Sequence, residues 1–192
     1  MATATPLRLM TAEEFYEWVH RPENADRHFE LVSGEVIEMP PPGVRHGVVC
    51  GNVAWILGSF VRQCNRGYVC SNDMGIILER APDTVRGADV SLFDQAQRYA
   101  DVTRKYSEEI PNVAVNVLSP DDRPGRTARR IDQFLKRGVP LVWLVNPEDC
   151  TVTVYRRDKP CRVLGTQEVL TGEDILPDFH CRVADFFKMP GE

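Results

Sequence analysis

Residues 113–145 read VAVNVLSPDDRPGRTARRIDQFLKRGVPLVWLV, and this stretch decides the fold class. The runs Val113–Leu118 and Leu141–Val145 are almost continuously apolar and rich in β-branched residues, which is typical of strands buried on both faces. Between them the pattern predicts a helix from about 124 to 137, with Gly138 as its stop. Such a strand–helix–strand unit implies a right-handed parallel crossover.

The rest of the chain adds further predicted elements around this unit. We expect a short amphipathic helix over 12–20, a hairpin over 29–39, a core helix over 46–63, strands over 68–78 and 88–93, a polar loop with a helical turn over 94–109, and an antiparallel pair over 151–156 and 162–169. Thr11 and Glu14 form a capping box at the first helix. The element order predicts an α/β fold in which a mixed sheet is flanked by helices. Trp18, Trp55 and Trp143 are expected to fill its core.

Length and composition limit the class of protein. A chain of 192 residues suits one globular domain. The 43% hydrophobic and 27% charged fractions exclude disorder and collagen-like structure. The net charge of −5 means that any nucleic-acid binding must use a local basic patch. The chain has no continuous apolar run of about 18 to 20 residues, and Met1–Met10 lacks the apolar region of a secretory signal, so a cytoplasmic protein without membrane association is expected.

The cysteines do not follow a known metal-binding spacing. They fall at positions 50, 64, 70, 150, 161 and 181, and none forms a Cys-x-x-Cys pair. In a chain of this length without a secretory signal, reduced and mostly buried thiols are favoured over a disulfide framework.

Three polar residues interrupt the predicted strands. Glu30, Asp89 and Asn116 each lie within a strand-like run. Because burial of an unpaired carboxylate or amide is costly, each needs a partner, a metal or a solvent-filled cleft. The alternatives are an outward-facing Glu30, an Asp89 in a turn or helix cap, and an Asn116 that ties two strands together. His46, which opens the long helix, is a helix cap, a surface residue or a ligand.

A group of cations marks the helix that follows Asn116. Its members are Arg123, Arg126, Arg129, Arg130, Lys136 and Arg137. They are consistent with a solvated helix face or with a phosphate-binding patch. Their enrichment in a net-acidic chain favours the patch.

Short motifs along the chain occur in the order of a known family. They are FELVSGEV at 29–36, His46, ADVS at 88–91, VAVNVLSP at 113–120, GVP at 138–140, WLVNP at 143–147 and ILPDF at 175–179. In this order they resemble the Uma-type restriction endonuclease family of the PD-(D/E)xK nuclease superfamily. The resemblance covers about residues 9–187 and implies one restriction-endonuclease-like domain, expected to span 1–192.

The resemblance implies a metal-dependent phosphodiesterase core that acts on DNA. Asp89 would be the aspartate of the PD element, Asn116 stands at the second acid, and Arg130 stands at the lysine. Glu30 and His46 match an upstream glutamate and a histidine of the family. The implied ion is Mg²⁺ or Mn²⁺, held by Asp89, Asn116 and Glu30. The implied nucleic-acid contacts are Arg123, Arg126, Arg129 and Arg130.

Two of these positions depart from the family pattern in a way that affects the chemistry. Asn116 removes a negative charge beside the cation, which weakens metal binding by roughly thirty- to a hundredfold. Arg130 keeps its charge and can bind a phosphate, but it cannot act as a base. Ala88 replaces the proline of the PD pair, with less consequence. We therefore expect a weakly bound ion and an impaired site.

Three functions remain open from the sequence. The first is a Mg²⁺-dependent endonuclease that hydrolyses DNA phosphodiester bonds with a partly degenerate site. The second is a catalytically inactive nuclease-fold module that binds nucleic acid or a protein partner through its basic helix. The third is a structural homodimer formed by edge strands within 151–170.

Overall fold

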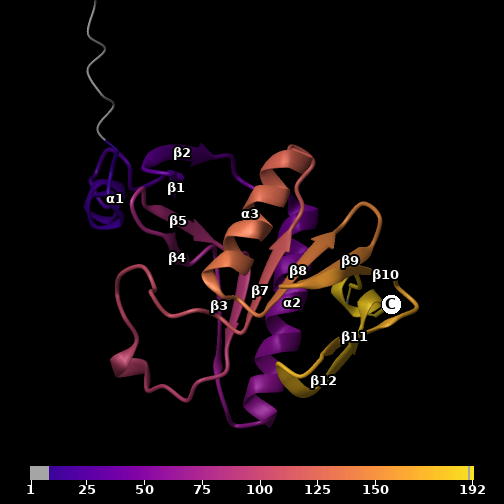
Figure 1. Cartoon of the computed structure of the whole chain (residues 1–192). Coiled ribbons are helices and arrows are strands. Elements are labelled where there is room, and N and C mark those ends of the chain that lie inside the picture. Colours follow the sequence, from indigo (N-terminus) through magenta and orange to yellow (C-terminus); the bar gives the residue numbers. More distant parts are fainter. Residues whose placement is uncertain (1–8, 190) are drawn as a thin grey trace, which may run out of the picture.

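The computed structural model describes residues 9–189 and 191–192, and its strands form three sheets (Figure 1). The helices are α1 (Ala12–Val19), α2 (Val44–Gln63) and α3 (Pro124–Arg137), with 3₁₀ turns at Tyr99–Asp101 and Val183–Phe186. The predicted single domain over 1–192 extends beyond the described residues and stays a prediction. So does the absence of a secretory signal, because residues 1–8 lie outside them.

The largest sheet has the order β10-β9-β8-β7-β6-β3. Its strands are β3 (Tyr68–Ser71), β6 (Val90–Phe93), β7 (Val113–Val117), β8 (Leu141–Asn146), β9 (Thr151–Arg156) and β10 (Lys159–Leu164). β7 and β8 pair in parallel, with Val115 beside Trp143, whereas the other neighbouring strands run antiparallel. The predicted mixed sheet and its parallel crossover are therefore confirmed.

Two smaller sheets complete the fold. The order β2-β1-β5-β4 joins β1 (His28–Val32), β2 (Glu35–Met39), β4 (Gly75–Glu79) and β5 (Thr84–Gly87), and a separate ribbon pairs β11 (Val169–Gly172) with β12 (Leu176–Arg182). Thr11 and Glu14 form the predicted capping box of α1. The hairpin predicted over 29–39 is confirmed as β1 and β2.

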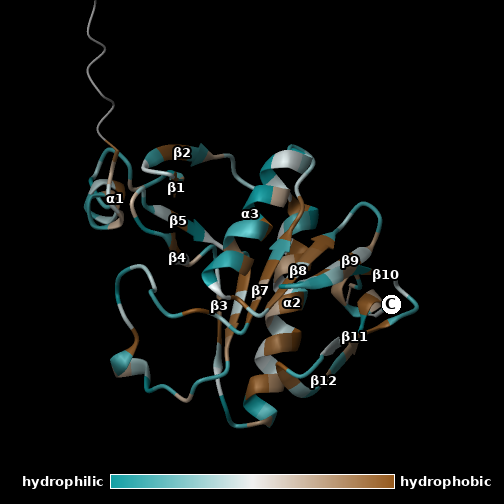
Figure 2. Cartoon of the chain, in the orientation of Figure 1, coloured by the Kyte–Doolittle hydropathy of each residue, from teal (hydrophilic) through white to brown (hydrophobic). Residues whose placement is uncertain are grey.

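Helices α2 and α3 cover opposite faces of the large sheet (Figure 1). Successive side chains of a strand point to opposite faces. Val113, Val115 and Val117 accordingly pack in the cluster that contains Val49, Val53 and Leu57 of α2, whereas Ala114 packs with Ile131 and Phe134 of α3. Figure 2 shows the resulting core as hydrophobic central strands between the two helices. Alternation along β7 therefore assigns Asn116 to the α3 face.

One predicted strand is in fact two. The run expected over 68–78 is broken by Asn72 and Asp73, whose φ angles of 66° and 51° lie in the left-handed region. This turn ends β3 in the large sheet and starts β4 in the smaller one. The apolar residues on either side gave a continuous strand pattern because local composition does not reveal a change of sheet.

Burial also corrects two expectations. Trp143 is fully buried, but Trp55 is 73% exposed because it lies on the side of α2 that faces away from the sheet. All six cysteines are free, and none of them is buried; Cys64 and Cys161 are exposed.

Among the described residues, α2 is long and apolar enough to cross a bilayer by length and composition. Its buried residues Val49, Val53, Leu57 and Val61 lie in the main hydrophobic cluster, which is the packing of a core helix.

Candidate functional site

Asp89 belongs to the bend between β5 and β6, and its side chain lies beside the end of β7. The antiparallel register pairs Val90 with Val115, and one further step brings Asp89 opposite Asn116. The amide of Val117 donates a hydrogen bond of 2.7 Å to Asp89 Oδ2. This bond fixes the carboxylate at the end of β7. Among the described residues, no hydrogen bond joins the side chains of Asp89 and Asn116.

The other oxygen of Asp89 binds His46 in the first turn of α2. His46 Nε2 lies 3.0 Å from Asp89 Oδ1, and each side chain is 11% exposed. The hydrogen bond to Asp89 raises the pKa of His46, while burial opposes the rise. The pair therefore favours the charged imidazolium and forms a nearly closed site beside the adjoining ends of β6 and β7.

Cys50 joins this pair from the next turn of α2. Its Sγ lies 3.4 Å from His46 Nδ1. One ligand atom from each of His46, Cys50 and Asp89 falls within 4.8 Å of the others. Burial, followed by the charges of Asp89 and Asp73, raises the pKa of the Cys50 thiol. Sequence spacing did not reveal this group, because Asp89 comes from a distant segment.

Asn116 is buried without a partner. Its side chain belongs to a residue that is 4% exposed, and neither Oδ1 nor Nδ2 forms a hydrogen bond in the described part of the chain. The amide therefore does not tie two strands together. An unsatisfied buried polar group costs roughly 1–3 kcal/mol, so it points to an interaction outside the folded chain itself.

Glu30 lies in a buried ion network instead of facing outward. Its Oε2 accepts a bond of 2.6 Å from Arg86, and its Oε1 lies 2.8 Å from Arg130 Nη2. Arg86 also donates to Gln133, whose amide donates in turn to Glu79. Both carboxylate oxygens of Glu30 are thus occupied by guanidinium groups.

Asp73 links the two groups and was missed by the sequence analysis. Burial raises the pKa of Asp73, and the negative charge of Asp89 raises it further, whereas the nearby charge of Arg130 lowers it. The Asp73 backbone packs closely on Gly87. A Cβ added at Gly87 would lie 2.3 Å from the Asp73 carbonyl oxygen. The dipeptide Asn72-Asp73 inside a strand-like run was the only available signal.

Most of the predicted basic patch is bound within the protein. Arg130 also donates to the Gly87 carbonyl, Arg129 donates to the Ser33 hydroxyl, Arg137 donates to the carbonyls of Ile77 and Glu108, and Lys136 pairs with Asp132. Arg123 and Arg126, at the start of α3, are exposed and have no side-chain partner among the described residues. They are the cations of this helix that remain available to a ligand.

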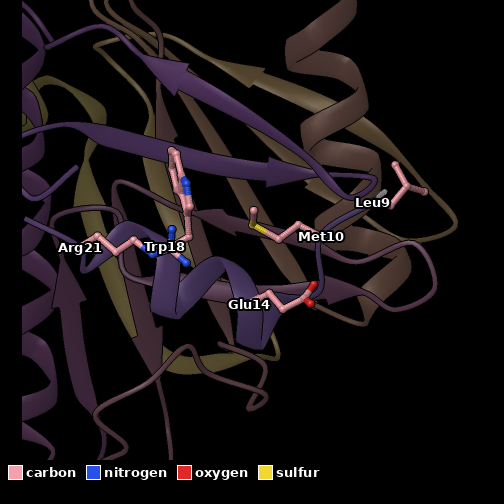
Figure 3. A pocket seen from close by; sticks show the side chains of 5 residues that line it. All are labelled: Leu9, Met10, Glu14, Trp18 and Arg21. Carbon is pink, nitrogen blue, oxygen red and sulfur yellow. The ribbon is translucent and has the colours of Figure 1, made fainter. Parts of the chain in front are cut away.

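A surface hollow lies elsewhere, beside α1 (Figure 3). It is lined by Leu9, Met10, Glu14, Trp18 and Arg21 and has a volume of about 410 Å³. None of the predicted site residues lines it. His46 and Asp89 lie instead beside the adjoining ends of β6 and β7, where their side chains are largely closed from solvent.

The donor atoms determine which residues fit a divalent metal. Glu30 does not fit, because both its oxygens are paired with arginines. Asp89 supplies a carboxylate, and the Oδ1 of Asn116, which has no hydrogen-bond partner among the described residues, supplies a neutral oxygen. Mg²⁺ commonly binds one or two carboxylates together with water and substrate phosphates. By donor type, Asp89 and Asn116 therefore suit a divalent cation with few protein ligands.

Comparison with known proteins decides the family. A family model described as "Putative restriction endonuclease" matches residues 12–184. The chain belongs to the Uma2 family. The crystal structure of a putative nuclease of DUF820 from Anabaena variabilis ATCC 29413 has a similar fold, with a TM-score of 0.78 and 21% identity over 93% of this chain and 97% of that one. No curated protein matches the sequence.

The Uma2 assignment confirms the resemblance carried by the motif order. It also confirms the restriction-endonuclease-like fold class, since the structural likeness extends over nearly all of both chains. In this Uma2 chain the motif residues form two pairs, His46 with Asp89 and Glu30 with Arg130, with Asp73 electrostatically coupled to both.

Proposed function

We propose that this Uma2 protein is a divalent-metal-dependent endonuclease that hydrolyses DNA phosphodiester bonds with a reduced set of acidic ligands. The observation that carries the proposal is the buried amide of Asn116, which has no hydrogen-bond partner among the described residues, one position beyond the register partner of Val90 in a family described as restriction endonucleases. A buried polar group without a partner is costly unless a ligand satisfies it.

The chemistry divides among a few side chains. Asp89 and Asn116 would hold Mg²⁺ or Mn²⁺, which when bound polarises a phosphoryl oxygen and favours hydroxide formation. The Val117 amide and His46 orient the Asp89 carboxylate through its two oxygens. The resemblance implies that Glu30 is a metal ligand. In this proposal Glu30 instead positions Arg130 through their ion pair.

Arg123 and Arg126 supply the electrostatic attraction for DNA. Both are exposed beside the start of α3, where positive partial charge of the helix terminus also favours phosphate. Such contacts bind the backbone and do not specify sequence. The homodimer and the cytoplasmic location stay predictions.

The test is cleavage of supercoiled plasmid and single-stranded DNA with Mg²⁺ or Mn²⁺. We expect the wild type to nick DNA slowly and Asp89→Asn to lose this activity. Asp132→Asn is the matched control, because Asp132 is an exposed acid that pairs only with Lys136 among the described residues. Asn116→Asp should increase cleavage by restoring a carboxylate. Equal rates for the wild type and Asp89→Asn would reject the proposal.

The second candidate is a DNA-binding module without catalysis. It is favoured by the mutual pairing of Glu30 and Arg130, which occupies the cation at the family's lysine position. Here the wild type would bind DNA at low salt but would not cleave it with either metal. Arg123→Ala with Arg126→Ala should weaken binding to all sequences and lower the salt slope by about 1 per lost phosphate contact.

A further inference from the structure

We propose that His46, Cys50 and Asp89 bind a transition-metal ion of the zinc class, and bind it more tightly than Asp89 binds Mg²⁺. The inference rests on the proposed function in treating Asp89 as a metal ligand. It adds the ion's chemical class and assigns Cys50, to which the resemblance gave no role.

The two helical ligands are placed by the geometry of α2. His46 and Cys50 are four residues apart, so their side chains lie on the same helix face, one turn apart. Cys50 Sγ lies 3.4 Å from His46 Nδ1, so these two side chains are in contact, and one ligand atom from each of the three residues lies within 4.8 Å of the others. Asp89 approaches from the bend before β6, with its Oδ1 3.0 Å from the imidazole.

The donor types select the ion. Mg²⁺ prefers an octahedron of oxygen atoms and keeps several waters. Imidazole and thiolate suit zinc and similar ions, which commonly take three protein ligands and leave a fourth position open for water. Asn116 contributes no charge, and Glu30 is occupied by two arginines. The imidazole of His46 and the thiol of Cys50 are therefore the strongest metal donors close to the Asp89 carboxylate.

Ion binding would replace the present hydrogen bonds within this group. The Cys50 thiol would lose its proton to solvent and form a sulfur–metal bond, while one ring nitrogen of His46 and one oxygen of Asp89 would form the others. The negative charge of the thiolate would offset the charge missing at Asn116. Within the described residues, this is the one group of three such side chains in which one ligand atom from each lies within 4.8 Å of the others.

The decisive measurement uses Co²⁺ as a spectroscopic substitute for Zn²⁺ on the metal-free full chain. We expect Co²⁺ to give a thiolate-to-metal charge-transfer absorption, which Zn²⁺ displaces and excess Mg²⁺ does not. Cys50→Ser should abolish this absorption and weaken Zn²⁺ binding at least about tenfold. Cys70→Ser is the matched control, since Cys70 is also half-buried and free but lies outside the group.

A second readout does not depend on a variant. In the wild type, Zn²⁺ should protect Cys50 from alkylation while leaving Cys64 and Cys161 reactive, as determined by mass spectrometry of the labelled peptides. Absence of the charge-transfer absorption, or equal Zn²⁺ affinity of Cys50→Ser and Cys70→Ser, would overturn the inference. Mg²⁺-supported cleavage, together with a Zn²⁺ affinity that is unchanged by Cys50→Ser, would overturn it and leave the proposed endonuclease intact. Thiolate-bound Co²⁺ without DNA cleavage would uphold the metal site and reject the endonuclease.

Discussion

The guanidinium of Arg130 lies 2.8 Å from the carboxylate of Glu30, deep in the fold. The cation at the family's lysine position thus neutralises an acid of its own chain. Arg86 binds the other oxygen of the same carboxylate. Removal of Glu30 would leave two guanidinium groups without their shared counterion, so this carboxylate has a large effect on stability.

Glu30→Gln tests this structural part of the network. We expect it to lower the free energy of unfolding by about 3–5 kcal/mol, because two buried guanidinium groups lose their shared anion. Urea denaturation measures the change. Glu38→Gln is the control, since Glu38 pairs with Arg27 on the surface and should have little effect. Similar stabilities for the two variants would contradict the buried network.

The His46–Asp89 pair predicts a pH-dependent stability of the metal-free protein. The hydrogen bond raises the pKa of His46 above its ordinary value of 6.5. Because the pKa is higher in the folded state, protonation of His46 stabilises the folded protein. This stabilisation is fully present below pH 6.5, the ordinary pKa, and is lost as the pH rises through the folded-state pKa. The stability advantage of the wild type over His46→Gln should therefore shrink as pH increases from 6 upward, as measured by urea unfolding.

NMR titration of the His46 ring checks the cause of this dependence. Asp89→Asn should lower the pKa of His46, since it removes the largest contribution to the shift. Asp132→Asn, on the surface of α3, should leave the titration unchanged. If both variants titrate like the wild type, Asp89 is not the partner of His46 in solution.

We expect the buried amide of Asn116 to lower the stability of the ligand-free protein. Asn116→Leu removes a buried amide without partners and should raise the free energy of unfolding by about 1 kcal/mol, while it abolishes any metal-dependent cleavage. Asn112→Leu is the matched comparison, because Asn112 Oδ1 accepts a 2.8 Å bond from the Asp94 amide and its loss should destabilise. Thermal unfolding compares the two. Equal destabilisation would mean that Asn116 has a partner in solution.

Two glycines should respond to alanine with opposite signs. Gly87→Ala places a Cβ against the backbone of Asp73 and should destabilise by about 1–3 kcal/mol, because backbone cannot move aside cheaply. Gly51→Ala, on the open side of α2, should stabilise by about 0.5–1 kcal/mol through helix propensity. Denaturation of both variants tests the placement of the Asp73 turn. Neutral behaviour of Gly87→Ala would contradict it.

Local patterns were sufficient for the elements that form from neighbouring residues. The helix predicted over 124–137 is α3, and Gly138 ends it with a φ of 111°. The capping box at Thr11 and the buried strands β7 and β8 also match. In each case the deciding interactions lie within one or two turns of helix or along one strand, so adjacent sequence contains the information.

The amino-acid sequence by itself determined the α/β class, the crossover unit and the family, because periodicity and motif order are properties of the chain alone. Only the tertiary structure decided the partners of the polar residues: Glu30 with two arginines, Asp89 with His46 and Cys50, and Asn116 with none in the part of the chain that the structure describes. Those partners are far apart in sequence. Strand register and helix placement bring them together, and no local pattern specifies which side chains then meet.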